Sequence, residues 1–182
     1  MAVLRIASST SARRTAARRR ELAAALVAAS TCLALLPTAA SAATPPRCTV
    51  PQLAGSLRAG SPGAGQRFAT LRLRNRSPRA CSLFGYPGGQ LLSRSGAEIP
   101  TDIVRDRSRT PRTVVLRPGA AAKTLLHWGA VAGSGDRQRG RCQPNPARFE
   151  VTPPNATNHL VLRWTFGPVC ERGRIVVRPM SL

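Results

Sequence analysis

The segment LRLRNRSPRACSLFGYPGGQLL, from Leu71 to Leu92, says more about the fold than any other part of this chain. Leu71 and Leu73 alternate with arginines, a polar segment follows at 75–79, and apolar residues resume beyond it. Alternation with a period of two is typical of a half-buried strand, so the segment predicts two antiparallel strands joined by a polar turn. We expect Cys81 to open the second strand and to tie the pair to another part of the sheet through a disulfide.

Similar short apolar segments recur between turn residues along the rest of the chain. The candidate strands cover residues 48–57, 67–75, 81–92, 99–104, 113–116, 121–128, 148–152, 160–166 and 175–177. Two strands have clear inward faces, formed by Ala122, Thr124, Leu126 and Trp128 and by Leu160, Leu162, Trp164 and Phe166. About nine strands without a helical period predict an all-β, immunoglobulin-like antiparallel β-sandwich. "Immunoglobulin-like" describes the architecture only, because neither tryptophan has the spacing from a cysteine pair that antibody domains show.

The N-terminal 42 residues predict a signal peptide. Six arginines and no acidic residue in 1–20 precede an apolar run at 22–36, and Ala40-Ser41-Ala42 offers the small residues that a signal peptidase requires. We therefore expect a helical signal peptide at 1–42, a secreted product, and one domain at 43–182. About 15 apolar residues span roughly 22 Å, less than a hydrocarbon core of about 30 Å, so we favour no membrane anchor and no transmembrane span in the mature chain.

Two variants of export stay open. Arg19-Arg20 resembles part of a twin-arginine signal, although the large apolar residue expected after it is missing. Cys32 could carry a lipid, but Ala29-Ser30-Thr31 before it lacks the large apolar residue that lipoprotein processing favours. We expect Cys32 to be an ordinary residue of the apolar run.

The four cysteines beyond residue 43 predict two disulfides, because an even count in an exported chain is typical of oxidised pairs. They are Cys48, Cys81, Cys142 and Cys170. Three connectivities are possible, and we favour Cys48 with Cys81 and Cys142 with Cys170, since each pair brackets a short run of strands. No two cysteines are close enough in sequence for the usual paired ligands of zinc, so we expect neither a metal nor a cofactor.

The chain is strongly basic. Without residues 1–42 it has 22 basic and 6 acidic residues, hence a formal charge of 22 − 6 = +16, which would attract anionic polymers at low salt. Every cation except Lys123 is an arginine, a bias that a GC-rich genome produces without any binding function. Where arginines alternate with apolar residues, as at Arg72 and Arg74, a solvated sheet face also explains them.

The residue patterns of common enzymes are missing. Gly133-Ser134-Gly135 lacks the frame of a nucleophile elbow, and both histidines, His127 and His159, alternate outward from apolar strand faces. Only Asp102 and Asp106 are neighbouring acids, beside arginines in a predicted loop. Most of the few aromatic residues fall on predicted core faces, which disfavours base stacking and specific nucleic-acid recognition. We expect no enzymatic activity, with a hydrolase assembled from distant residues as the alternative.

Several motifs together resemble a known family. They are Cys48, Leu71-x-Leu73-x-Asn75-x-Ser77, Cys81-x-Leu83-x-Gly85-Tyr86-Pro87, Leu116-x-Pro118-Gly119, Trp128, Cys142, Pro153-Pro154 and Cys170. This set resembles a domain of unknown function common in exported proteins and lipoproteins of actinobacteria. The resemblance implies a secreted or cell-envelope β-sandwich and brings no catalytic residues.

The expected function is binding or structural, outside the cytoplasm. The sequence does not identify the ligand. The alternative that composition suggests is binding of anionic wall polymers by the arginine-rich surface. Asn75, Gly85, Tyr86 and Pro87 form the signature to test first. Tyr86 could present its ring to a partner, although we favour a buried ring with a hydrogen-bonded hydroxyl.

Overall fold

A computed structural model describes residues 43–133 and 135–182. The predicted signal peptide, Cys32 and Arg19-Arg20 lie outside the described residues. The described chain has two 3-10 turns, η1 (Val50–Gln52) and η2 (Glu171–Gly173), and neither has the length or apolar character that crossing a bilayer requires. The strands are β1 (Leu53–Ala59), β2 (Gln66–Asn75), β3 (Cys81–Phe84), β4 (Gly88–Leu92), β5 (Glu98–Ile99), β6 (Asp102–Arg105), β7 (Thr113–Leu116), β8 (Ala121–Gly129), β9 (Arg148–Thr152), β10 (Leu160–Arg163) and β11 (Arg174–Val177).

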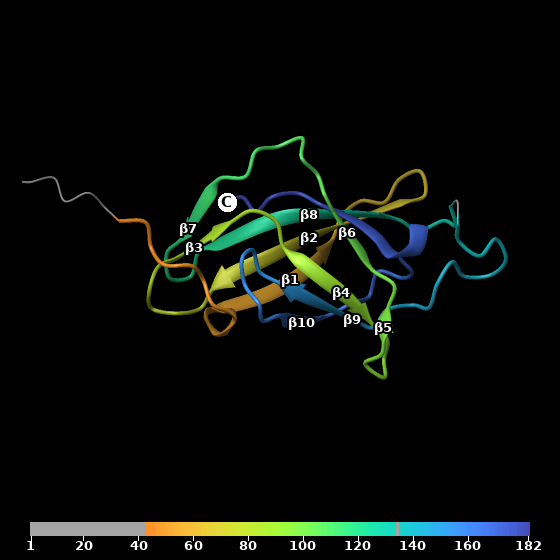
Figure 1. The fold of residues 1–182 in the computed structure, drawn as a ribbon, viewed down its shortest axis with the longest axis horizontal. Coiled ribbons are helices and arrows are strands. Elements are labelled where there is room, and N and C mark those ends of the chain that lie inside the picture. Colours follow the sequence, from red (N-terminus) through yellow and green to blue (C-terminus); the bar gives the residue numbers. More distant parts are fainter. Residues whose placement is uncertain (1–42, 134) are drawn as a thin grey trace, which may run out of the picture. The chain divides into compact units, whose positions relative to one another are not determined.

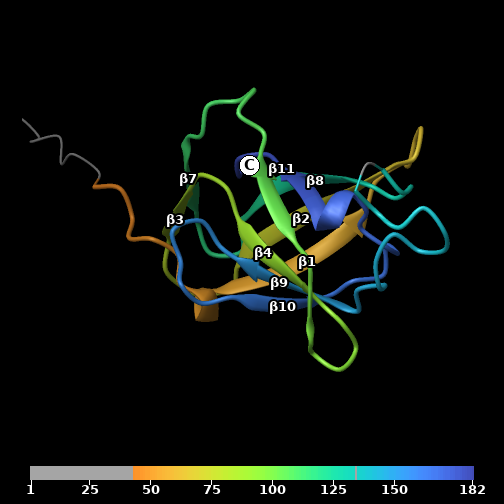
Figure 2. The same cartoon turned by 45° about the vertical axis from the view of Figure 1, so that its right-hand side comes forward.

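The strands form three sheets (Figures 1 and 2). The five-stranded sheet has the order β1-β2-β8-β11-β6, the four-stranded sheet has the order β10-β9-β4-β5, and β3 pairs with β7. The all-β class is confirmed, and two main sheets around one core are compatible with the expected sandwich. Within the described chain, the strand pairs are antiparallel except β6 and β11, which run in parallel with Ile103 opposite Ile175.

The predicted pairing of 67–75 with 81–92 is wrong. Strand β2 has β1 on one edge and β8 on the other, so both of its hydrogen-bonding edges are occupied. The second predicted strand is divided at Gly85–Pro87 into β3, which pairs with β7, and β4, which pairs with β5 and β9. The polar segment after Asn75 therefore leads the chain into another sheet instead of reversing it.

Three other predicted strands have different limits. The strand predicted at 160–166 ends at Arg163, and of its predicted inward face Trp164 is buried while Leu160, Leu162 and Phe166 are half-buried. The strand predicted at 48–57 begins at Leu53 and not at Cys48, because Val50–Gln52 forms a turn that contains Pro51. The predicted edge strand at 99–104 is divided between β5 and β6, which are edge strands of different sheets. Pro100 separates them, and a residue without a backbone N–H suits this corner.

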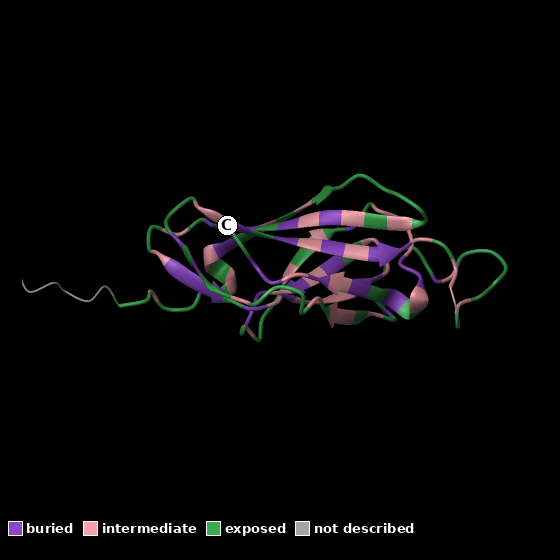
Figure 3. Ribbon diagram, turned by 90° about the horizontal axis from the view of Figure 1, so that it is seen from above, coloured by how far each residue is buried: buried purple, intermediate pink, exposed green. Residues whose placement is uncertain are grey.

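The core lies where the alternating apolar faces of the sheets meet, and Figure 3 shows the resulting bands of burial along the strands. The predicted inward face of β8 is confirmed, since Ala122, Thr124, Leu126 and Trp128 are all buried. Aromatic rings fill one part of the core: the Trp164 ring centre lies 4.8 Å from that of Trp128, 5.5 Å from that of Phe149 and 5.1 Å from that of Phe166.

Glycines bring backbone close to these side chains. A Cβ atom at Gly55 on β1 would lie 3.0 Å from Leu162 on β10, so the two sheets approach closely there. A Cβ atom at Gly89 on β4 would overlap the Phe149 ring of β9. The absence of a side chain at Gly89 thus leaves the space that the ring occupies.

Both favoured disulfides are present. Cys48 bonds to Cys81 at the start of β3, where the N-terminal segment also exchanges backbone hydrogen bonds with Ser82. Cys142 bonds to Cys170 and ties the loop at 130–147 to the segment before β11. With separations of 33 and 28 residues, each bond contributes about 3.5 kcal/mol on the loop-entropy model.

Candidate functional site

A groove of about 960 Å³ lies beside β7 and β8. We call it the basic groove. Its lining comprises Thr70, Arg109, Thr110, Arg112–Val115, Lys123–Leu125 and Arg178–Leu182. Thr70, Lys123 and Leu125 lie on the outward side of β2 and β8, opposite the core-facing residues of the same strands. The size is within the usual range of ligand pockets, which is about 300–1,000 Å³.

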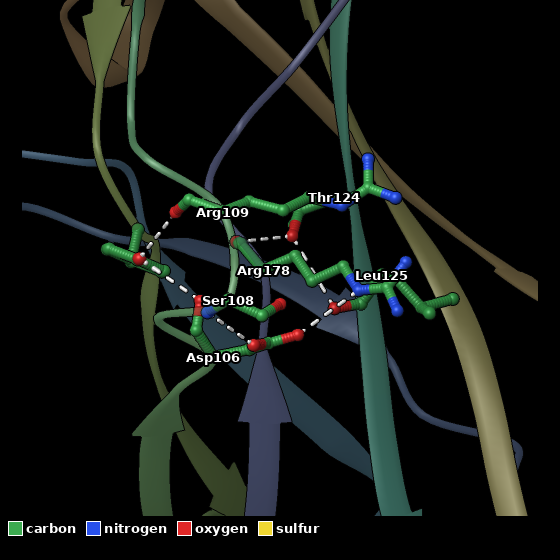
Figure 4. A network of polar contacts seen from close by, with 7 residues as sticks. Asp106, Ser108, Arg109, Thr124, Leu125 and Arg178 are labelled. Carbon is green, nitrogen blue, oxygen red and sulfur yellow. Dashed lines mark hydrogen bonds and ion pairs between the residues drawn. The ribbon is translucent and has the colours of Figure 1, made fainter.

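The first wall is the arginine-rich loop between β6 and β7, and it is held in place by several hydrogen bonds. The Asp106 backbone N–H donates to the Val177 carbonyl oxygen over 2.8 Å, and the Ser108 N–H donates to Asp106 Oδ1 over 2.9 Å. Asp106 Oδ2 accepts from Arg178 Nε over 3.3 Å. Figure 4 shows the contacts of the Asp106 carboxylate with Ser108 and Arg178, and the Arg109 and Arg178 side chains both extend toward β8.

The Asp106 carboxyl group is ionised at neutral pH, because its surroundings lower its pKa. Hydrogen bonds from the side chain and backbone of Ser108 lower the pKa of Asp106, and the Arg178 guanidinium lowers it further. The carboxylate also neutralises Arg178 locally. The other three cations of the basic groove, Arg109, Arg112 and Lys123, form no ion pair with any residue in the described part of the chain.

The second wall is the segment 178–182, which continues β11 along β8 after a bulge. Val177 lies opposite Leu126, whereas Ser181 lies opposite Lys123, so the β11 side of the ladder contains one extra residue. The Lys123 N–H donates to the Ser181 carbonyl oxygen over 2.7 Å, and Thr124 Oγ1 donates to the Arg178 carbonyl oxygen over 2.6 Å. The buried hydroxyl of Thr124 therefore fixes the bulge.

The signature residues Gly85 and Tyr86 hold both walls, and Pro87 is buried directly before β4. The Gly85 carbonyl oxygen accepts from the Met180 N–H over 2.9 Å, which ties down the second wall. The Tyr86 hydroxyl is shared between the carbonyl oxygens of Asp106 and Arg109, at 3.1 and 3.3 Å, which ties down the first. The hydroxyl is hydrogen-bonded as expected, while the ring is only half-buried and has the Arg105 guanidinium 5.7 Å from its centre.

Asn75, the fourth signature residue, is fully buried, and its side-chain amide is hydrogen-bonded through both of its polar atoms. Its Nδ2 donates to the carbonyl oxygens of Arg79 and Leu116 over 2.7 and 2.9 Å. Its Oδ1 accepts from the N–H and the hydroxyl of Ser77 over 2.9 and 2.8 Å. The side chain thus joins the crossing after β2 to the end of β7, the strand that lines the basic groove.

The polar residues considered for catalysis do not converge. His127 Nε2 lies 2.7 Å from Gln66 Oε1 and its ring stacks on Phe68, while His159 Nε2 lies 3.2 Å from Glu150 Oε1 elsewhere on the surface. Asp102 is exposed on β6, and Asp106 serves the loop. The described residues include no group of three or more His, Cys, Asp or Glu side chains arranged to hold a metal ion.

A second polar cluster surrounds Asp136 beside the Cys142–Cys170 disulfide. Its carboxylate accepts the backbone N–H groups of Gly133, Glu171 and Arg172 over 2.7–3.0 Å. Burial alone would raise the pKa of Asp136, but these three donors and the Arg172 charge outweigh it and lower the pKa. Glu171 and Arg172 have left-handed backbone conformations, with φ of 54° and 59°, so the carboxylate stabilises a strained turn.

Sequence patterns did not reveal the basic groove, because its lining comes from segments far apart in the chain. Even the position of Lys123 on β8, directly opposite Arg72 on β2, depends on a strand pairing that the sequence did not predict. Like charges directly across a ladder are destabilising, so this pair lowers the stability of the strand pair slightly.

Residues 48–181 match the sequence pattern of the family described as a domain of unknown function, DUF4232. The match covers most of the chain, and the protein belongs to this family. No curated protein and no solved structure shows significant similarity to the chain.

Proposed function

We propose that this member of the DUF4232 family is a secreted, non-enzymatic binding domain of the cell envelope whose ligands are anionic wall polymers. Export is supported by the arginines and apolar run of residues 1–42 and by the two disulfides, which persist in oxidising compartments. The resemblance of the Cys-x-Leu-x-Gly-Tyr-Pro element to exported actinobacterial proteins supports a location in the cell envelope of an actinobacterium.

One observation carries the proposal: most arginines of the described domain have no carboxylate within ion-pair distance. Among the described residues, Arg174 and Arg178 are the only arginines within ion-pair distance of a carboxylate. On the outward side of the five-stranded sheet, Arg58, Arg72 and Lys123 follow one another over β1, β2 and β8, and all three are exposed. A surface of this kind concentrates polyanions near it at low ionic strength.

The non-enzymatic part of the proposal is supported by the side chains that line the basic groove. They supply cations, hydroxyls and apolar surface, but no histidine and no carboxylate that could move a proton at neutral pH. Such a site can hold an anion and has no group to transfer a proton from or to it.

The test is retention on isolated cell wall as a function of salt. We expect strong retention at about 20 mM salt and release by about 500 mM, because screening shortens the reach of exposed charges to a few ångströms. The double variant Arg58→Gln with Arg72→Gln should elute at lower salt than the parent. Retention that does not change between low and high salt would refute the proposal.

A further inference from the structure

We propose that the basic groove is a discrete site for a phosphate monoester that carries an apolar chain. The inference deepens the proposed function and rests on it for the attraction of anions to this surface. It concerns one site and one small ligand, whereas polymer retention needs only the distributed charge.

The cationic part of the groove fits a phosphate. Arg109, Arg112 and Lys123 have no carboxylate partner in the described chain, and the hydroxyls of Thr110 and Ser181 are exposed beside them. A phosphate monoester presents three acceptor oxygens and up to two negative charges, and guanidinium groups bind such oxygens in pairs. Three cations and two neighbouring hydroxyl donors therefore suit the three oxygens and two charges of a phosphate better than the two oxygens and one charge of a carboxylate.

The apolar part of the groove indicates that the ligand is more than a phosphate. Val115 is 40 % exposed and Leu182 is 75 % exposed, and both line the groove together with Leu125. Of the five large apolar side chains that the described domain exposes, two therefore line this groove, together with Arg109, Arg112 and Lys123. An alkyl chain would cover this surface and leave its phosphate at Arg109 and Arg112.

The groove is also preformed. Tyr86 and Asp106 hold the loop wall, and the hydrogen bonds of Gly85, Lys123 and Thr124 hold the segment at 178–182. A ligand therefore meets walls that are already fixed by hydrogen bonds, which reduces the ordering cost of binding.

The experiment compares three ligands below their micelle concentrations by isothermal titration calorimetry: octyl phosphate, inorganic phosphate and octyl glucoside. A fully buried methylene contributes about 0.8 kcal/mol, or roughly fourfold in affinity, so burial of four methylenes gives octyl phosphate an advantage of about 200-fold over inorganic phosphate. We expect one octyl phosphate per protein and no binding of the uncharged glucoside.

Variants separate the charge from the apolar surface. Arg109→Gln with Arg112→Gln should weaken octyl phosphate binding at least tenfold. The matched control, Arg139→Gln with Arg141→Gln, removes the same charge from exposed positions in the 130–147 loop, at the other end of the sheets from β7, and should leave it unchanged (Figure 1). Val115→Ser should reduce the advantage of octyl over inorganic phosphate while inorganic phosphate binds as before.

Binding to lipid vesicles distinguishes a lipid headgroup from a soluble phosphate ester as the ligand. The protein is sedimented with phosphatidylcholine vesicles that contain phosphatidic acid. Sedimentation that only the Arg109→Gln with Arg112→Gln variant abolishes would identify a lipid headgroup as the ligand. Octyl phosphate binding without sedimentation would identify a soluble ester. Equal affinity for octyl and inorganic phosphate, or equal loss in both double variants, would overturn the site. Salt-sensitive retention on cell wall would then persist, so this failure is distinguishable from failure of the proposed function.

Discussion

Replacement of Tyr86 tests how the basic groove is built. Tyr86→Phe removes only the hydroxyl that the carbonyl oxygens of Asp106 and Arg109 share, which should cost about 1 kcal/mol of the free energy of unfolding. Tyr86→Ala also removes a half-buried ring packed against the core, worth about 2 kcal/mol after allowance for its partial exposure. It further loses the Arg105 contact, so the total should be about 3 kcal/mol.

Urea unfolding under oxidising conditions provides the measurement. With a denaturant slope of about 2 kcal/mol per molar, the Ala variant should shift the midpoint by about 1.5 M and the Phe variant by about 0.5 M, with unchanged slopes. Phe84→Ala is the control, because this neighbouring ring is 50 % exposed and should cost about 0.5 kcal/mol. If both Tyr86 variants unfold with the midpoint of the parent, the role assigned to the tyrosine in holding the loop is wrong.

Three further predictions concern the scaffold. Asn75→Ala should cost about 3 kcal/mol in urea unfolding, because it leaves the buried carbonyl oxygen of Leu116 without its donor; a cost below about 1 kcal/mol would contradict this reading. Gly89→Ala should lower the free energy of unfolding by about 2 kcal/mol, because the new Cβ would overlap the Phe149 ring. Gly63→Ala is the control, since its new Cβ would meet no atom within 4 Å, and it should be nearly neutral in thermal unfolding. The pKa values of Asp106 and Asp136 are lowered in the folded state, so their stabilisation is present above the unfolded value of about 4 and is lost as pH falls through the folded values. Thermal unfolding from pH 6 to pH 2 should show this loss, and Asp106→Asn with Asp136→Asn should flatten the acid limb of the profile.

The strands could be predicted because alternation along the chain records which face is buried. The limits of β7 were predicted as 113–116, and the inward face of β8 was predicted correctly, since its apolar residues recur with a period of two. Their partners could not be predicted this way. The alternation of Leu71 and Leu73 is the same whether β2 pairs with β3 or, as it does, with β1 and β8.

The basic groove could not be predicted for a related reason. Its cations occupy outward positions such as Lys123 and loop positions such as Arg109 and Arg112, where a solvated arginine gives the same local pattern. The bulge that forms the second wall depends on Thr124, which the alternation of β8 marks only as a core residue. Its hydroxyl has a partner 54 positions away, and no local pattern encodes that distance.

The parallel pair of β6 and β11 has a consequence for how the domain is assembled. Strand β6 ends at Arg105, and its one partner in the described chain begins at Arg174, so the chain must be made as far as β11 before the two strands can pair. Contacts between segments so distant in the chain form slowly, since a long loop must close first. Until then Ile103 and Val104 present an open edge on which another nascent chain could add. Crowded, concentrated expression therefore favours aggregation through β6, and slow dilution during refolding should reduce it.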